Sequence, residues 1–302
     1  MKIPFLRSVV PPHVFCLLDE GVTYARVREG SPSGFEESRH FRYPAGPFKA
    51  GAHVRLTREA LSEAVRAARA LSGGRLSRAS VVYPDAWARI LPVELESIPS
   101  DDDAGREMVA WKLKKLLPPT AGELALAWRA MPVVSEEKRV LVAAAPRDTM
   151  ESIETAFEEL GVRVGYLAPA SLALFEGLSA VLGREAGKDY GILHRTTGGT
   201  SFFIARNGEA IFFRHRPADD DDPDREARLS LSYYAEKLKG PGLSAVYVHD
   251  ELPGGELRNV SAFPTAPVSL SAAVLPVDAD FDARVASRPE LMAGFAAVMG
   301  GR

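Results

Sequence analysis

The sequence predicts an α/β protein built from two structurally similar halves, and two stretches carry that prediction. From Tyr190 to Arg216, short apolar strands alternate with turn-forming residues, a pattern typical of a three-stranded meander. Within it, Asn207-Gly208 supplies the two positive-φ positions of a tight hairpin turn. A second strand–turn–strand–turn–strand pattern runs from His13 to Tyr43, so we expect a duplicated fold.

The composition is that of an ordinary soluble protein. The chain has 302 residues, 46% hydrophobic and 25% charged, enough for two domains or one large bilobal unit. Its net charge of -3 offers no basic field for nucleic acid or a membrane surface. The single cysteine, Cys16, excludes an internal disulfide and is expected to be a packing residue. No apolar run approaches the roughly 18 residues of a membrane span, and no signal peptide is evident. A cytoplasmic protein is therefore expected.

Between and after the meanders, helices and strands alternate. Apolar periodicity predicts helices over 57–71, 104–117, 150–160, 169–182, 226–238 and 289–299. It predicts strands over 79–83, 90–95, 124–130, 139–145, 162–167 and 243–249, with Pro92 confining the second of these to an edge or an irregular position. Residues 183–189 are expected to link the halves, and 274–282 to be irregular.

Two charged stretches allow two interpretations each. Lys112, Lys114 and Lys115 either bind anionic lipid or form a solvated helix face, and the solvated face is favoured. The acidic run 218–225 either binds a cation or is a solvated loop. Because it lacks the glycine and the distal glutamate of a calcium loop, the solvated loop is favoured.

The sequence offers little sign of catalytic chemistry. His194, His215 and His249 lie in or beside strands without metal-ligand spacing, so they are expected to be structural or surface residues, and no metal site is predicted. The candidate phosphate loops are the turns 19–21 and 198–200 in the two meanders. Their backbone N–H groups either hold phosphates, with a nearby carboxylate placing Mg²⁺, or the glycines simply form tight turns.

Three segments resemble a known family. Residues 140–178 read as an apolar strand, Ala-Pro-Arg, a long helix, Leu-Gly-Val and then Ala-Ser-Leu-Ala-Leu. Residues 108–119 form a helix that ends in proline after paired basic residues, and 228–249 contain Ser-Leu-x-Tyr-Tyr and a strand. This order resembles the PilM family of type IV pilus assembly proteins, within the actin-like ATPase superfamily.

The resemblance implies an actin-like (ribonuclease H-like) duplicated fold with two lobes. Residues 1–183 would form the N-terminal lobe, with an inserted PilM-type subdomain at about 79–145. Residues 184–302 would form the C-terminal lobe. Its outer subdomain would be largely deleted, since only about thirty residues separate Phe213 from Leu243.

The nucleotide motifs of that family are altered here. In the first hairpin Asp19 and Gly21 match and Arg26 stands at the place of a lysine. Val22, Thr23 and Tyr24 replace small residues, and Tyr24 would crowd a phosphate if it faced the cleft. In the second hairpin, aligned on Thr200-Ser201, Arg195 stands for the aspartate and Thr197 for the glycine. Only Gly254 and Gly255 remain of the adenosine turn, and Asp250 and Glu251 beside it disfavour an anionic ligand.

The resemblance therefore implies a degenerate nucleotide cleft that has no catalytic residues, needs no cofactor and is not functional. The residues of this cleft would be Asp19, Gly21, Gly198, Gly199, Thr200, Gly254 and Gly255. The expected function is that of a pseudo-ATPase scaffold at the inner membrane. It would bind the cytoplasmic N-terminal peptide of a PilN-like partner, together with other pilus assembly components, and no nucleic acid. The alternative is an actin-like protein that binds or hydrolyses Mg·ATP at a nonstandard site around Asp19, Gly198 and Thr200. The sequence does not distinguish a type IV pilus from a type II secretion system. It also does not identify the partner-groove residues or the oligomeric state.

Overall fold

The computed structural model describes residues 10–28, 34–48, 54–99, 101–116, 123–134, 136–182, 188–218, 222–252, 257, 260–263, 265–271 and 274–300. The chain forms two compact units. Unit 1 comprises residues 1–84, 148–181 and 271–302, and unit 2 comprises residues 85–147 and 182–270. The segment predicted as an inserted subdomain thus packs mainly with unit 2, and the C-terminal segment packs with unit 1. The division into lobes between residues 183 and 184 stays a prediction.

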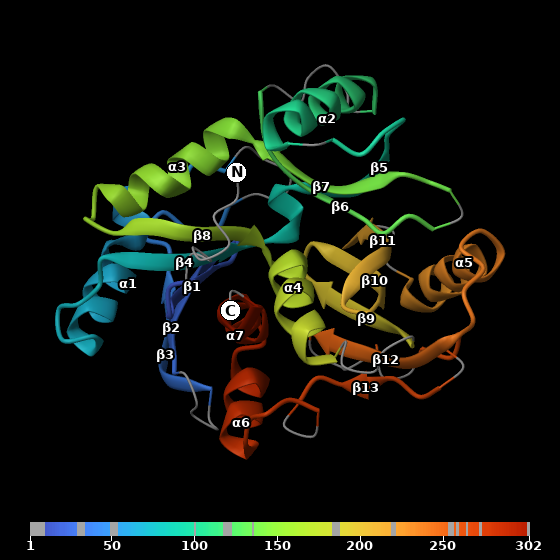
Figure 1. The fold of residues 1–302 in the computed structure, drawn as a ribbon. Helices are drawn as coiled ribbons and strands as arrows, with labels where there is room; N and C mark the ends of the chain where they lie inside the picture. Colours follow the sequence, from blue (N-terminus) through green and yellow to red (C-terminus); the bar gives the residue numbers. More distant parts are fainter. Residues whose placement is uncertain are drawn as a thin grey trace. The chain divides into compact units, whose positions relative to one another are not determined.

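Unit 1 is built on a five-stranded sheet with the order β3-β2-β1-β4-β8 (Figure 1). β1 pairs antiparallel with β2, and β2 with β3, whereas β4 and β8 extend the sheet in parallel. The strands are β1 (His13–Leu17), β2 (Gly21–Val27), β3 (Phe35–Arg42), β4 (Arg78–Tyr83) and β8 (Arg163–Pro169). The predicted first meander is confirmed.

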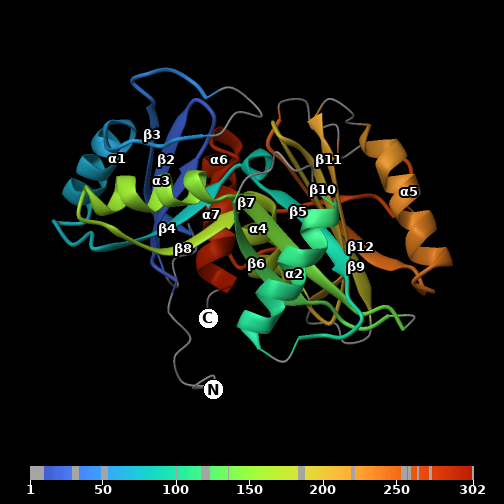
Figure 2. The same ribbon diagram turned by 90° about the horizontal axis from the view of Figure 1, so that it is seen from above.

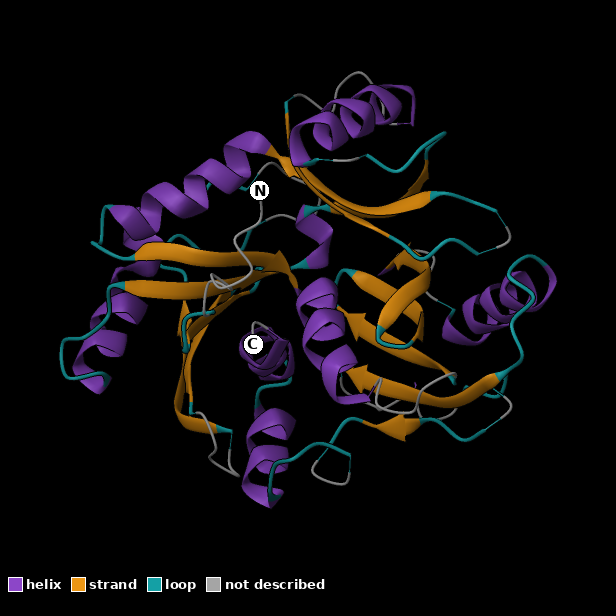
Figure 3. Ribbon diagram, viewed as in Figure 1, coloured by secondary structure: helices purple, strands orange, loops and turns teal. Residues whose placement is uncertain are grey.

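Helices on both faces bury the apolar side chains of this sheet. They are α1 (Arg58–Leu71), α3 (Arg147–Glu158), α4 (Ala170–Leu182), α6 (Ala279–Ser287) and α7 (Leu291–Gly300). α1 begins at its N-cap Thr57, whose side chain accepts from Ala60 N, and it buries the predicted stripe of Leu61, Ala64, Val65 and Ala68. α7 packs on β1, β2 and β4 and is buried almost throughout (Figure 3, beside the mark C).

The expectation of an irregular segment over 274–282 is wrong in its last part. α6 begins at Ala279 because the carboxylate of Asp278 accepts hydrogen bonds from the N–H groups of Asp280 and Phe281. The Phe281 ring then stacks on Phe35 at 5.5 Å between centroids and meets Phe295 at 4.8 Å. The capping signal is present in the sequence, but the aromatic contacts that hold the helix are distant along the chain.

Unit 2 repeats the sheet topology of unit 1 with the order β11-β10-β9-β12-β13. The strands are β9 (Asp189–Thr196), β10 (Gly199–Arg206), β11 (Glu209–Pro217), β12 (Leu243–Asp250) and β13 (Val268–Ser269). β9, β10 and β11 are antiparallel, and β12 and β13 are parallel to β9. Asn207 and Gly208 have φ of 52° and 79°, which confirms the predicted hairpin turn. The two matched sheets confirm the predicted duplication.

A second, three-stranded sheet with the order β5-β7-β6 lies in unit 2 and is covered by one helix (Figure 2). Its elements are β5 (Arg89–Glu94), α2 (Asp102–Leu116), β6 (Leu124–Ala130) and β7 (Arg139–Pro146), preceded by a 3₁₀ turn η1 (Asp85–Trp87). β5 is an edge strand, as Pro92 predicted. Val93, Val109, Leu113, Val140 and Val142 form the core beneath α2.

The helix α5 (Pro223–Glu236) packs against β10 and β11. It begins three residues earlier than predicted, since Asp222 caps it and Pro223 occupies its first turn, so the last part of the acidic run is helical. Tyr234 on α5 donates to Asp189 Oδ2 at 2.5 Å, and Arg206 forms two 2.7 Å hydrogen bonds to the same carboxylate. Among the described residues, no helix is both long and apolar enough to span a bilayer.

Candidate functional site

The predicted nucleotide residues are distributed over both units. Asp19 and Gly21 lie in the β1–β2 hairpin of unit 1, and Gly198, Gly199 and Thr200 lie in the β9–β10 hairpin of unit 2. Gly254 and Gly255 lie outside the described residues. Of the predicted residues, the structure places Gly198 and Gly199 together in one turn, next to the buried Thr200.

Strand register shows that Gly21 and Gly199 are equivalent positions of the two units. Leu17 pairs with Val22 across the first hairpin, and Arg195 pairs with Thr200 across the second. A Cβ added at Gly21 would lie 2.3 Å from the carbonyl oxygen of Phe41, and one at Gly199 would lie 1.9 Å from that of Arg216. Both glycines therefore allow the second strand of the meander to approach the third.

This register also corrects the alignment of the second hairpin. Asp19 lies two residues before Gly21, and Thr197 lies two residues before the equivalent Gly199. The residue of unit 2 equivalent to Asp19 is therefore Thr197, two positions beyond Arg195. Arg195 lies inside β9, where its Nη1 is 3.9 Å from Asp250 Oδ2. The cation therefore belongs to a pair within the sheet, while the position equivalent to Asp19 holds an uncharged threonine.

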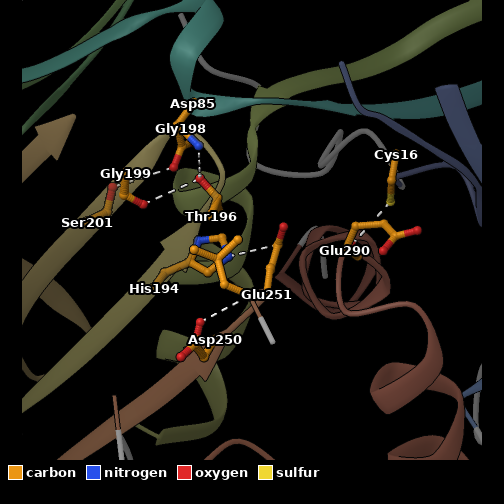
Figure 4. Close-up of polar contacts among 11 residues, drawn as sticks. Cys16, Asp85, His194, Thr196, Gly198, Gly199, Ser201, Asp250, Glu251 and Glu290 are labelled. Carbon is orange, nitrogen blue, oxygen red and sulfur yellow. Dashed lines mark hydrogen bonds and ion pairs between the residues drawn. The ribbon is translucent and has the colours of Figure 1, made fainter. Parts of the chain in front are cut away.

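The β9–β10 turn is closed by its own side chain (Figure 4). Thr196 Oγ1 accepts from the N–H of Gly198 at 3.1 Å and donates to the carbonyl of Gly199 at 3.5 Å. In a phosphate-binding turn, backbone N–H groups point at the ligand. Here the N–H of Gly198 is already used by a hydrogen bond within the turn.

Tyr24 does not face an open cleft. Its side chain is fully buried in unit 1, where its ring lies 5.1 Å from that of Phe15 and its hydroxyl shares a 3.0 Å hydrogen bond with His13 Nδ1. Burial raises the pKa of Tyr24 to about 12, so the hydroxyl stays protonated. The crowding expected if Tyr24 faced the cleft therefore does not apply.

A row of polar side chains crosses one face of the unit 2 sheet. His215 pairs with Ser201, Ser201 with His194, and His194 with His249 on four adjacent strands. Residues paired directly across strands lie on the same face, so the four side chains are neighbours. Ser201 Oγ lies 2.9 Å from His215 Nδ1 and 3.5 Å from Asp85 Oδ2 of η1. His194, Ser201, His249 and Asp85 are all buried.

His194 forms the centre of this row with Glu251. His194 Nε2 lies 2.9 Å from Glu251 Oε1, and the imidazoles of His194 and His249 stack with 5.4 Å between their centroids. Burial lowers the pKa of His194, but the hydrogen bond and charge of Glu251, helped by Asp85 and Asp250, outweigh it and raise the pKa above its ordinary value. Glu251 follows β12 and is held there by its N–H, which donates to the carbonyl of Arg195 at 2.9 Å.

Unit 1 carries a related but simpler cluster at the equivalent position. Thr23 hydrogen bonds with His40 Nδ1 at 3.0 Å and donates to Glu290, as Ser201 contacts His215 and Asp85 in unit 2. Burial lowers the pKa of His40, and Arg288 adds to this effect. Each unit thus joins a hydroxyl, an imidazole and a carboxylate across its second and third strands.

The sequence reasoning did not bring Glu251, Asp85 and the two histidines together. His194 and His249 are distant along the chain and meet only because β12 pairs with β9 in parallel. Asp85 follows a predicted strand and Pro84, which gave no indication of its contact with Ser201. An Arg-His pair recurs near the end of the third strand in both meanders. This repeat indicates that His40 and His215 are equivalent, but it gives no information on His194, His249 or Glu251.

Comparisons with known proteins bear on the fold. No protein-family model matches the sequence, and no curated protein matches it. A chain of a PilM–PilN type IV pilus biogenesis complex is similar over 97% of both chains, with 16% identity and a TM-score of 0.69.

Two other solved structures are similar at 10% identity. One is a Bacteroides thetaiotaomicron protein with an actin-like ATPase fold, which covers 95% of this chain and 99% of its own with a TM-score of 0.51. The other is the cytoplasmic domain of EpsL, an inner membrane component of the Vibrio cholerae type II secretion system, with a TM-score of 0.52 over 87% of this chain and 92% of its own. The matched sheets and these likenesses show that the chain has the actin-like ATPase fold, as the family resemblance implied.

Proposed function

We propose that this chain is a PilM-like scaffold of a type IV pilus or related secretion assembly. In this proposal it lies in the cytoplasm, binds the cytoplasmic N-terminal segment of a PilN-like inner-membrane protein and does not hydrolyse ATP. The observation that carries the proposal is the similarity over 97% of both chains to a component of a PilM–PilN complex. The likeness to the cytoplasmic domain of EpsL supports the same class of assembly.

A groove on unit 2 has the properties of a peptide-binding surface. It has a volume of about 410 Å³ and lies between the end of β5 and α2. Trp111 on α2 is 55% exposed although it is the largest side chain lining the groove. A contiguous apolar patch marks an interaction site, whereas a single exposed apolar side chain does not, and here Leu95, Met108 and Trp111 line one groove. The lining residues are Leu95, Glu96, Ser97, Glu107, Met108, Trp111 and Lys112.

The groove carries charges of both signs. Glu96 and Glu107 line it together with Lys112, and the Nζ of Lys115 lies 3.6 Å from the centre of the Trp111 ring. Segments on the cytoplasmic side of a membrane span carry an excess of Lys and Arg, and a chain's N-terminal amine adds another positive charge. We therefore place the partner's segment here, with apolar side chains against Met108 and Trp111 and basic groups near the two glutamates.

The hairpin geometry supports the absence of ATP hydrolysis. The N–H of Gly198 donates to Thr196 Oγ1 and is not directed at a ligand. Gly21 and Gly199 are needed because a Cβ at either position would collide with a carbonyl oxygen of the third strand. Thr197 stands where unit 1 has Asp19, so this turn lacks the carboxylate that would place Mg²⁺. These features favour the pseudo-ATPase over the nonstandard ATPase.

Partner binding is tested with a synthetic peptide of a PilN-type N-terminal segment. We expect saturable binding by fluorescence anisotropy, weakened about tenfold or more by Trp111→Ala, the loss expected for an anchoring aromatic. Leu229→Ala is the matched control, since Leu229 is 42% exposed on α5 and does not line the groove. Equal weakening in both variants would refute the placement, and no binding to any pilus or type II secretion component would refute the function. The same test with both classes of peptide distinguishes the two assemblies.

The ATPase alternative is tested by calorimetry with Mg·ATP. The proposal expects no heat of binding at sub-millimolar nucleotide and no phosphate release above the buffer rate. Saturable binding in that range would overturn the pseudo-ATPase assignment and leave the partner assignment to its own experiment.

A further inference from the structure

We propose that His194, His249 and Glu251 form a binding site for one divalent transition-metal ion, for which Zn²⁺ is the probe. The donor atoms of these three side chains all lie within 4.8 Å of one another. All three residues belong to unit 2, so the site does not depend on how the two units are arranged. The proposal also does not depend on partner binding.

The sheet brings the three ligands together by two simple rules. His194 and His249 are directly paired on the parallel strands β9 and β12, so their imidazoles lie side by side on one face. Glu251 follows His249 by two residues and therefore projects to the same face, where its Oε1 lies 2.9 Å from His194 Nε2. Figure 4 shows the carboxylate of Glu251 directed at His194.

The distances fit a zinc site after a small adjustment. Ligand bonds of about 2.0–2.1 Å in a tetrahedron put donor atoms about 3.4 Å apart. The donors here need to move by no more than about 1.5 Å, since they already lie within 4.8 Å of one another. Glu251 lies beyond the last residue of β12, so its side chain can adjust while the histidines stay in the sheet.

The surroundings favour a cation. Glu251 brings a negative charge, and Asp85 and Asp250 lie close enough to act electrostatically on His194. One nearby cation, Arg195, is paired with Asp250. His194 is fully buried, His249 is 6% exposed, and the Glu251 side chain retains 12% exposure, which gives the ion a path from solvent. The charge of a divalent ion would thus be balanced within the site.

The donor set indicates the class of ion. Imidazole nitrogens favour Zn²⁺, Cu²⁺, Ni²⁺ and Fe²⁺ over the oxygen-seeking Mg²⁺ and Ca²⁺. Two imidazoles and one carboxylate leave a fourth position open to water. The ion would join the carboxyl ends of β9 and β12, which supply the two histidines, to Glu251, which follows β12.

The test uses the untagged full chain, stripped with a chelator, because a histidine tag binds the same ions. We expect calorimetry to show one Zn²⁺ per chain, and Co²⁺ to give the intense visible bands of a tetrahedral complex. His249→Gln and Glu251→Gln should each weaken Zn²⁺ binding at least about 100-fold, because each removes a direct ligand. His215→Gln is the matched control, since His215 lies on the same face but is not among the three ligands. It should change the affinity less than about threefold.

Two results would overturn the proposal. One is the absence of saturable binding of Zn²⁺, Co²⁺ or Ni²⁺ below about 100 µM, which would leave His194 and Glu251 as a plain hydrogen-bonded pair. The other is binding that survives both ligand substitutions, which would place the ion elsewhere. If the variants fail to fold, X-ray absorption of the zinc-loaded wild-type chain decides, because the proposal requires two imidazole donors.

Discussion

The substitution Gly199→Ala tests whether the hairpin glycines serve the backbone or a phosphate. Gly199 has φ of 130°, and an added Cβ would lie 1.9 Å from the carbonyl oxygen of Arg216. Real Cβ atoms essentially never approach within 3.0 Å, so β11 would have to move away by about 1 Å and lose part of its pairing with β10. Overpacking costs about 1–3 kcal/mol and the strained φ another 1–3 kcal/mol. We expect a loss of about 2–6 kcal/mol of unfolding free energy.

The chain offers a separate reporter for each unit. Its three tryptophans, Trp87, Trp111 and Trp128, all lie in unit 2, so intrinsic fluorescence follows the unfolding of that unit. Its single cysteine, Cys16, is 2% exposed in unit 1, so thiol labelling follows the opening of the other unit. Guanidinium titrations with both reporters therefore show which unit a substitution destabilises.

Two matched substitutions calibrate this measurement. Gly21→Ala places a Cβ 2.3 Å from the carbonyl of Phe41 without positive φ, so we expect about 1–3 kcal/mol, reported by Cys16. Gly198→Ala places a Cβ 3.0 Å from the methyl and 3.2 Å from the backbone N of Ala86 without positive φ, so the strain is smaller than at Gly199 and we expect about 1 kcal/mol. A Gly199→Ala chain as stable as the wild type would refute the backbone explanation. If that chain also lost a measurable affinity for ATP, the phosphate explanation would replace it.

Three further results are expected. Thr196→Val should cost about 1 kcal/mol and Thr196→Ser much less, because the hydroxyl accepts from the N–H of Gly198; equal losses in tryptophan-monitored unfolding would contradict this. Asp189→Asn should cost about 1.5–3 kcal/mol by the same assay, because it removes the charge of the buried carboxylate that accepts two hydrogen bonds from Arg206; a loss below about 1 kcal/mol would refute that reason. Burial lowers the pKa of His13, so the unfolded chain takes up this proton first as the pH falls below about 6.5. Stability should therefore fall with falling pH, by at most about 1.4 kcal/mol per pH unit from this group, and circular dichroism should show a shallower dependence in His13→Leu.

Local signals were sufficient for the elements of the fold. The Asn207-Gly208 pair predicted its hairpin because few residue pairs adopt two successive positive φ values. Pro92 predicted an edge strand because proline cannot donate to a neighbour, and β5 is an edge strand. The duplication was also predictable, since each meander repeats the same order of strands and turns. What these signals share is that each acts over a few neighbouring residues.

The site could not be predicted in the same way because its contacts depend on the pairing of distant strands. His194 and His249 become neighbours only when the register of β9 and β12 is known, and a shift by one residue would place them on opposite faces. Glu251 was noticed only as an acid that disfavours an anionic ligand. The same lack of register caused the error of two positions that put Arg195 in the place of Thr197.

The duplication separates what the fold requires in both units from what only one unit carries. Gly21 and Gly199 are equivalent, and each approaches a carbonyl of the third strand, so both units need a glycine there. The position of His194 is held by Cys16 in unit 1, because Cys16 pairs with Thr23 as His194 pairs with Ser201. Val82 likewise takes the place of His249. Unit 1 therefore provides the same backbone with a thiol and an apolar side chain in place of two imidazoles. The proposed cation site requires both imidazoles, so it would belong to unit 2, on a backbone scaffold that both units share.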